Sequence, residues 1–245
     1  IRACNIHHKI TVGEMPENPA FCISCEKGSK GMPGYCDPPN QDNWSATRFK
    51  SGWTLFCVHD GHGPYGHHVS TRTVQTVPWF LIQDSGFDKD LIDEDRIEQA
   101  LLHAFEKSQA DLVRYATENK IDMADSGSTA LAVLLKGNRV WTANLGDCRS
   151  VVGSAEAQLI FATEDHKPQH HVEKARIEAA GGEVRLEQVT HRIFIRGTDD
   201  PGLAVARAFG DLGLKDHGVI AVPEVKLTEV DLNKNVFVLI ASDGI

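Results

Sequence analysis

Residues 60–63 read Asp-Gly-His-Gly and directly follow a short apolar run, residues 53–59. Such a run ending in glycines predicts a buried strand followed by a tight turn. A carboxylate at the end of a strand, beside a glycine that lets the backbone approach closely, offers oxygen ligands to a hard divalent cation. His62 has a ring whose ordinary pKa lies near neutrality, which suits proton donation to a leaving group. Taken alone, the segment is equally consistent with an Asp-Gly turn that carries a surface histidine.

Three further aspartates stand in similar settings. Asp147 and Asp243 directly follow apolar runs, and Asp42 lies within Asn-Gln-Asp-Asn at 40–43. Aspartate is common in turns, so any one of them is more readily explained as structural. Carboxylates that converge repel one another unless cations compensate them, however, so these three together with Asp60 favour a two-metal hydrolase site.

Short strands and a few helices are expected to position these residues. Apolar residues at helical spacing predict a helix over 93–119, with a core-facing stripe from Ile97 to Tyr115. A second helix is expected at about 65–82, where Pro78 should kink or cut it. A third helix, at about 172–180, should stop at Gly181.

Strand-like runs separated by turn residues fill much of the remaining chain. They lie at 53–60, 129–136, 139–144, 149–152, 159–162, 224–229 and 236–241. The first four runs after residue 128 are predicted to form an antiparallel meander. Strands clustered in this way predict an α+β fold with antiparallel sheets rather than an alternating βαβ fold.

Composition narrows the class of protein. The 245 residues suit one domain, predicted over 37–245, preceded by an irregular arm over 1–36 that is rich in Gly, Pro, Lys and Cys. A formal charge of −9 argues against a broad basic face for nucleic acid. No apolar run approaches the ~20 residues of a membrane span. The chain opens on Ile1 without a signal-peptide pattern, so we treat it as part of something longer.

The six cysteines allow two interpretations. Cys22 and Cys25 could donate thiolates to zinc, with Cys4, His7, His8 or Cys36 completing the site, but the spacing matches no zinc-finger template. Reduced thiols in a cytoplasmic or nuclear protein are the favoured interpretation. Cys57 and Cys148, in strand-like segments, are expected to be buried and reduced.

Several segments, from about Asn40 to the last residue, resemble in order the motifs of the metal-dependent protein phosphatases of the PP2C (PPM) family, with the plant and protist members most similar. They are 56–63 around Asp-Gly-His-Gly, 125–130 with Gly-Ser-Thr-Ala, 143–149 with Gly-Asp-Cys-Arg, 165–168 with Asp-His-Lys-Pro, 173–184, 203–211 ending in Ala-Phe-Gly-Asp, 222–225, and 239–244 with Ser-Asp-Gly. Agreement across so many ordered segments does not arise by chance, whereas Asp-Gly-His-Gly alone would be weak.

This resemblance implies a four-layer αββα sandwich, in which two antiparallel β-sheets are flanked by helices and two Mg²⁺ or Mn²⁺ ions lie at one end. Asp60 would bridge the two metals and the Gly61 carbonyl would bind one of them. Asp243 would bind the other, Asp42 would act through water, and Asp147 would bind a third, weaker ion. His62 would protonate the departing Ser or Thr oxygen while a metal-activated water attacks phosphorus in line, without a covalent phosphoenzyme.

The same resemblance makes the chain a hydrolase of phosphoserine and phosphothreonine proteins that functions in signalling. It is expected to be a monomer with no nucleic-acid or membrane partner.

The sequence also departs from the family pattern. Gln41 replaces a usual Glu, and Asp37 stands where many members carry a basic residue that holds the substrate phosphate. Arg48 or Lys50 could take over that role. The chain ends at Ile245, before the family's last acidic motif, which suggests a truncated sequence.

Two rival functions follow from these observations. A pseudophosphatase that binds partners through the same fold is favoured slightly by Gln41, Asp37 and the missing end. A pure scaffold, however, has no need to keep Asp60, Gly61, His62, Asp147 and Asp243 together. A metal-dependent nuclease is opposed by the acidic net charge.

Overall fold

The computed structural model describes residues 2–3, 9–13, 21–26, 39–85 and 96–244. Its largest sheet has six strands, ordered β1-β4-β5-β8-β9-β16, and every neighbouring pair is antiparallel. The strands are β1 (Arg2–Ala3), β4 (Asn43–Arg48), β5 (Thr54–His59), β8 (Ala130–Lys136), β9 (Arg139–Leu145) and β16 (Glu224–Glu229).

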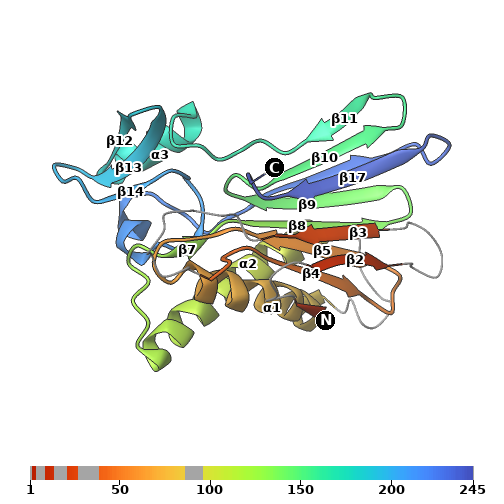
Figure 1. Ribbon diagram of the computed structural model, residues 1–245, viewed down its shortest axis with the longest axis horizontal. Coiled ribbons are helices and arrows are strands. Elements are labelled where there is room, and N and C mark those ends of the chain that lie inside the picture. The colour runs from red at the N-terminus through yellow and green to blue at the C-terminus, as the bar shows by residue number, and fades with distance from the viewer. Residues whose placement is uncertain (1, 4–8, 14–20, 27–38, 86–95, 245) are drawn as a thin grey trace.

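A second antiparallel sheet packs on one face of the first (Figure 1). It contains β11 (Leu159–Ala162), β10 (Arg149–Ser154) and β17 (Val236–Ala241), in that order. Apolar side chains fill the space between the sheets, with Leu131 and Val133 from β8 against Val152 of β10 and the half-buried Val238 of β17. The two sheets therefore form the sandwich that the family resemblance implied.

Two helices, α1 (Gly66–Ser85) and α2 (Ile97–Asn119), cover the other face of the six-stranded sheet (Figure 1). Successive residues of β8 point to opposite faces, so Ala130, Ala132 and Leu134 face the helices while Leu131 and Val133 face the second sheet. Burial on both faces explains why β8 is a continuous apolar run rather than an alternating one.

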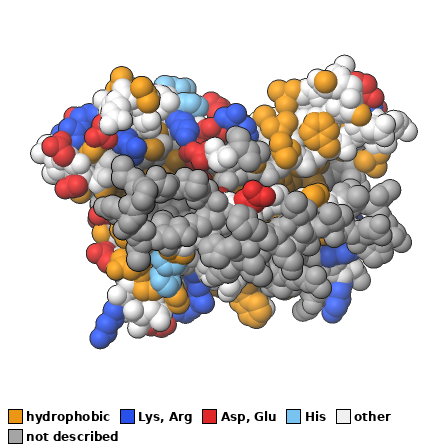
Figure 2. Space-filling model, viewed as in Figure 1, with side chains coloured by type: hydrophobic (Ala, Val, Ile, Leu, Met, Phe, Trp, Pro, Cys, Tyr) orange, Lys and Arg blue, Asp and Glu red, His pale blue; other side chains and the backbone are white. Residues whose placement is uncertain are grey.

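The fourth expected layer is not seen among the described residues. Phe237 and Leu239 of β17 and Leu159 of β11 are exposed, and apolar side chains gather over this sheet on the face that Figure 2 shows. The described part of the chain thus contains a helix layer and two sheets, and the predicted sandwich of antiparallel sheets with helices is confirmed.

Pro78 lies inside α1 and does not cut it, contrary to one expectation from the sequence. A proline has no backbone N–H and so cannot donate to the carbonyl four residues earlier, which here belongs to Val74. Ser45 Oγ of β4 donates to that carbonyl at 3.3 Å instead. A side chain from the adjacent sheet therefore satisfies the group that the proline leaves free.

The predicted meander has the right strands but a different pairing. β9 pairs with β8 and β16, whereas β10 pairs with β11 and β17, so the turn at Gly146–Asp147 carries the chain from the first sheet to the second. Gly146 has φ +108°, and a Cβ there would lie 2.6 Å from Thr129 Cγ2. Only glycine fits this crossing.

A smaller lobe between β11 and β16 was not predicted in full. The helix α3 (His171–Ala179) ends before Gly181 as expected, but β12 (Gly182–Glu187), β13 (Thr190–Ile195) and β14 (Pro201–Leu203) were missed, as was the 3₁₀ helix η2 (Leu212–His217). The lobe lies at one end of the sandwich (Figure 1) and has a small core of its own, which includes Ile177, Ile193 and Leu214.

The N-terminal stretch is more regular than predicted. β2 (Lys9–Gly13) and β3 (Phe21–Cys25) form an antiparallel hairpin, and β1 joins the edge of the main sheet beside β4. Cys22 is exposed whereas Cys25 is half-buried in the alternating pattern of β3, so the two thiols point to opposite faces and cannot share a zinc ion. Cys4, His7, His8 and Cys36 lie outside the described residues.

Cys57 and Cys148 are buried and free, as expected. Burial raises the pKa of the Cys57 thiol to about 12 and the pKa of Cys148 well above its ordinary value. Neither thiol therefore supplies a nucleophile. Among the helices within the described ranges, none has the length and apolar character that crossing a membrane requires.

Candidate functional site

Asp42 and Asp60 meet because the strands next to them are paired. Asn43, the first residue of β4, lies opposite His59, the last residue of β5. Asp42 therefore stands directly before one strand and Asp60 directly after its antiparallel neighbour, at the same end of the sheet. The two carboxylates are close enough for the charge of Asp42 to raise the pKa of Asp60.

Asp243 and Asp147 reach the same place from the second sheet. Ala241 of β17 lies opposite Arg149 of β10, so the residues just after β17 face those just before β10. Ser242 Oγ donates to Asp42 Oδ2 at 3.1 Å, which joins the end of β17 to the start of β4. All four predicted aspartates thus gather at one end of the sandwich, although no pair of them is near in sequence.

This carboxylate cluster, Asp42, Asp60, Asp147 and Asp243, is electrostatically unfavourable by itself. Burial, followed by the charges of the other three carboxylates, raises the pKa of Asp60 to about 8. Burial also raises the pKa of Asp42, with a smaller contribution from the charge of Asp243. Such carboxylates are stabilised by a bound cation more than by any neutral neighbour.

The type of donor fits hard divalent cations, which take carboxylate and carbonyl oxygens. Within the ranges that the structure describes, no three acidic, histidine or cysteine side chains are already spaced as the ligands of one metal ion. An octahedral ion that keeps several waters needs only one or two protein carboxylates, so the open spacing remains compatible with such an ion.

Gln41 and the glycines around it fix the backbone of this turn. Gly61 N donates to Gln41 O at 3.2 Å, and Gln41 Nε2 donates to Gly63 O at 2.7 Å. A Cβ on Gly61 would lie 2.6 Å from Gly66 O. The amide therefore makes a bond that a glutamate could not donate, which gives the departure at Gln41 a structural role.

His62 is paired with Asp211. Its Nε2 lies 3.0 and 2.9 Å from the two Asp211 oxygens, with side-chain exposures of 28% and 3% for the histidine and the aspartate. Burial alone would lower the pKa of His62, but the charge and hydrogen bond of Asp211, helped by Asp60 and Asp147, raise it overall. The imidazolium form is thus favoured, which leaves Nδ1–H as the ring's other donor.

A three-stranded mini-sheet positions this pair. β6 (Gly61–His62), β7 (Gly127–Ser128) and β15 (Phe209–Gly210) align His62, Gly127 and Gly210 across one row. A Cβ on Gly127 would lie 2.1 Å from Asp211 Oδ2 and 2.6 Å from His62 Nε2. The missing side chain of Gly127 is therefore what makes room for the ion pair.

Asp147 is held by residues of the lobe. Lys167 Nζ donates to Asp147 Oδ2 at 2.5 Å, and the backbone N–H of Gly146 donates to His166 Nδ1 at 3.1 Å. Further out, Arg207 Nη2 lies 2.7 Å from Glu173 Oε1, and Arg176 binds the same carboxylate. His166, Lys167 and Arg207 thus support the site from the lobe.

Two basic residues, Arg48 and Lys50, were suggested to hold the substrate phosphate, but both lie far from the carboxylate cluster. Arg48 is the last residue of β4, five residues from Asn43, so it stands about 17 Å from the carboxylate end of that strand. Lys50 lies just beyond it. Asp37 is outside the described residues. Lys167, which already contacts Asp147, is the lysine that the described structure places on the cluster.

Asp211 and Gly127 were not identified as site residues from the sequence, although both stand inside recognised motifs. Asp211 adopts φ +45°, an uncommon conformation for any residue except glycine, asparagine and aspartate. An aspartate directly after Phe-Gly in a short strand is the signal that could have revealed it.

Comparisons with known proteins agree with this geometry. The family model for protein phosphatase 2C matches residues 32–245. A rice protein (Oryza sativa subsp. japonica) described as probable protein phosphatase 2C 64 is 37% identical over 240 residues, covering 91% of this chain and 52% of the rice protein. Probable protein phosphatase 2C 34 of Arabidopsis thaliana is 33% identical and covers 78% of this chain and 57% of its own length. The chain thus spans about half the length of these curated relatives.

Solved structures share the fold. A serine-threonine phosphatase 2C from Toxoplasma gondii has a TM-score of 0.66 at 22% identity, covering 80% of this chain and 71% of that chain. A C. elegans sex determining protein has a TM-score of 0.65 at 21% identity, covering 80% and 46%. The match to the family model extends over most of the residues, and it includes every segment that builds the carboxylate cluster. The chain therefore belongs to the protein phosphatase 2C family.

Proposed function

We propose that the protein hydrolyses phosphoserine and phosphothreonine in other proteins, with Mg²⁺ or Mn²⁺ held by the carboxylate cluster. The observation that carries the proposal is the convergence of four aspartates from two sheets beside a histidine–aspartate pair. Family membership supports the same reaction. The net charge of −9 favours compensation by cations over binding of nucleic acid.

Asp60, the Gly61 carbonyl and Asp243 would hold two cations, with Asp42 acting through water and Asp147 available to a third. When bound, divalent cations in such a site supply a nucleophilic water and stabilise charge on the transferring phosphoryl group. The raised pKa of Asp60 fits this role, because a cation replaces the proton that the empty cluster would otherwise retain.

His62 serves as the general acid that protonates the departing Ser or Thr oxygen. Asp211 accepts from Nε2 and so fixes the ring and favours the charged form, which keeps the proton on Nδ1 available for transfer. Attack by water in line, without a covalent phosphoenzyme, agrees with the buried and protonated state of Cys57 and Cys148. Lys167 is the candidate for the missing basic contact to phosphate.

The test is release of phosphate from a phosphothreonine peptide by this chain and by a longer form that includes the family's last acidic motif. We expect turnover that requires Mn²⁺ or Mg²⁺ and is lost in Asp60→Asn. A folded longer form that binds metal but shows no turnover above the Asp60→Asn control would exclude the enzyme and leave a partner-binding role.

A further inference from the structure

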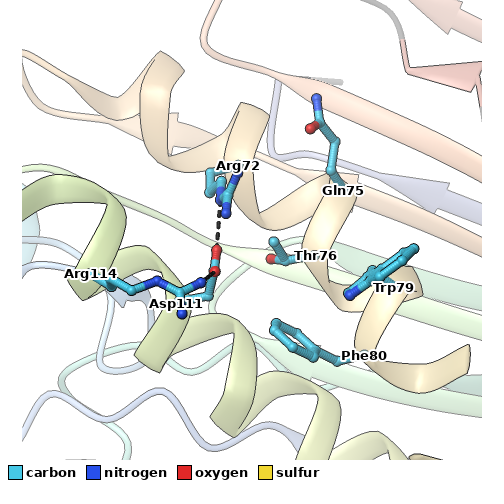
Figure 3. A pocket seen from close by; sticks show the side chains of 7 residues that line it. All are labelled: Arg72, Gln75, Thr76, Trp79, Phe80, Asp111 and Arg114. Carbon is cyan, nitrogen blue, oxygen red and sulfur yellow. Dashed lines mark hydrogen bonds and ion pairs between the residues drawn. The ribbon is translucent and has the colours of Figure 1, made fainter. Parts of the chain in front are cut away.

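A groove between α1 and α2 lies apart from the carboxylate cluster (Figure 3). This open groove has a volume of about 590 Å³. Its lining consists of Arg72, Gln75, Thr76, Trp79 and Phe80 from α1 and of Asp111 and Arg114 from α2. The side chains of both helices point into the same space, with Thr76 between the charged group at one end and the aromatic rings at the other (Figure 3).

The charged end presents cations to solvent. Asp111 is 5% exposed, and both of its oxygens are engaged: Oδ2 accepts from Arg72 Nε at 2.6 Å and Oδ1 accepts from Arg114 Nη2. The two arginine side chains are 34% and 65% exposed. A guanidinium has five N–H donors and each uses one on Asp111, so most donors remain for a ligand.

Neighbouring residues hold this arrangement in place. The Arg72 guanidinium lies over the Tyr115 ring, 5.1 Å from its centroid, which fixes the plane of the fork. Glu118 approaches Arg114 only to 4.0 Å, and both side chains are 65% exposed, so this second acid forms a weak pair in water. The groove thus presents two positioned forks and hides the carboxylate that orients them.

The other end of the groove is aromatic. Trp79 is 53% exposed and adjoins Phe80, which packs against the core. Large exposed aromatic side chains beside arginines are the residue types that dominate protein interfaces. The formal charges of Arg72 and Arg114 are balanced by Asp111 and Glu118, so net charge is not what distinguishes the groove. Asp111 is buried, however, and the exposed guanidinium N–H groups beside Trp79 offer hydrogen bonds to a carboxylate next to an apolar contact.

We propose that this groove is a docking site for a short acidic peptide segment of a partner protein, in which one Asp or Glu binds Arg72 and Arg114 while an adjacent aromatic or aliphatic side chain packs on Trp79. Arg72 is six residues along α1 from Gly66, so the charged end lies about 9 Å from the glycine that packs on Gly61. A partner docked here could present a phosphorylated residue a few positions away to the carboxylate cluster. That last step depends on the proposed function, whereas the docking does not.

The experiment is fluorescence anisotropy with a panel of fluorescein-labelled seven-residue peptides, each with two Asp or Glu residues and one Phe or Leu. Binding is measured in EDTA, where no hydrolysis occurs, so failure of docking and failure of catalysis are separate results. Arg114→Gln and Trp79→Ala change exposed side chains and leave Arg72 on Asp111. The matched control is Arg48→Gln, an exposed arginine at the end of β4, and thermal unfolding verifies that every variant is folded.

We expect at least one peptide to bind saturably with a Kd below about 1 mM. Each groove variant should weaken that binding by about fivefold or more, as should 0.5 M NaCl, while Arg48→Gln should not. The proposal fails if no peptide binds saturably, if Arg114→Gln binds as the wild type does, or if Asn and Gln versions bind equally well. Tighter binding of a phosphopeptide without carboxylates, or a dimer that Trp79→Ala abolishes, would also overturn it by assigning the groove a different occupant.

Discussion

Replacing Asp60 with Asn should stabilise the metal-free protein while it abolishes hydrolysis. The Asp60 carboxylate is half-buried, and this burial, followed by the charges of Asp42, Asp243 and Asp147, raises its pKa to about 8. An amide of nearly the same shape carries no charge and so relieves the repulsion. The same substitution removes the bridging ligand that we propose for the cations.

The magnitude follows from the pKa. A rise from 3.8 to about 8 is about four units, and each unit corresponds to about 1.4 kcal/mol. Near pH 7 the upper bound on the unfavourable free energy is therefore about 4 kcal/mol, which relaxation and water entry reduce to about 1–3 kcal/mol for Asp60→Asn. For a chain of this length, that corresponds to a Tm increase of about 2–6 °C.

The direction in which the free energy of unfolding changes with pH follows from the raised pKa of Asp60. A carboxyl whose pKa is raised on folding contributes stability that is complete below its unfolded value of 3.8 and is lost as pH rises towards 8. Wild type in EDTA should therefore lose stability between pH 5 and pH 8, and Asp60→Asn should lose less. Urea unfolding at both pH values measures the difference, with the exposed Asp216→Asn as the matched control.

Equal or lower stability of Asp60→Asn at pH 8 in EDTA, with Asp216→Asn unchanged, would refute the electrostatic argument. Added Mn²⁺ should reverse the ranking, because a cation bound to the folded state stabilises wild type more than the variant.

Three further predictions concern the supporting residues. Asp211→Asn should lower kcat about 10- to 100-fold and move the alkaline limb of the pH–rate profile to lower pH, because His62 loses the charge that raises its pKa. Gly127→Ala should lower kcat about 100-fold with metal affinity unchanged, since its Cβ would displace Asp211 and His62; steady-state kinetics and Mn²⁺ titration separate the two effects. Glu173→Gln should cost about 2–3 kcal/mol at pH 7, as it breaks a buried pair with Arg207. Although burial opposes ionisation, hydrogen bonds from Arg207 and Arg176 lower the pKa of Glu173 to about 2. The contribution of Glu173 to the free energy of unfolding is therefore complete above pH 4.5 and is lost as pH falls towards 2. Urea unfolding from pH 3 to 7 measures this contribution.

Each of these predictions has a contradicting result. If the alkaline limb of the pH–rate profile did not move in Asp211→Asn, a group other than His62 would determine that limb. A normal kcat in Gly127→Ala would mean that the pair tolerates displacement. If Glu173→Gln were as stable as wild type at pH 7, the buried ion pair would not stabilise the lobe.

The sequence could predict the ends of strands but not how those strands pair. The apolar runs before Asp60 and Asp243 predicted that each carboxylate stands at a strand end, and β5 and β17 confirm it. That the two ends coincide depends on pairing of β4 with β5 and of β10 with β17, which are contacts distant in sequence. Periodicity contains no information about which strands become neighbours.

Where predictions from local sequence patterns were wrong or incomplete, contacts between distant segments explain the difference. Pro78 was expected to disturb its helix, and a hydroxyl from β4 compensates for the missing bond. β12 and β13 carry polar residues on both faces around a small core, so their alternation is weak. Asp211 acquires its role only because β15, β7 and β6 align it with His62.

The most direct test of the central claim is Mn²⁺ binding, followed by electron paramagnetic resonance, on the same wild-type and Asp60→Asn samples used for phosphothreonine hydrolysis. We predict that wild type binds two Mn²⁺ with a magnetically coupled signal, and that Asp60→Asn loses the coupling and the turnover together while staying folded. Unchanged Mn²⁺ binding and hydrolysis in Asp60→Asn would contradict the claim that this carboxylate joins the two metals at the reaction centre.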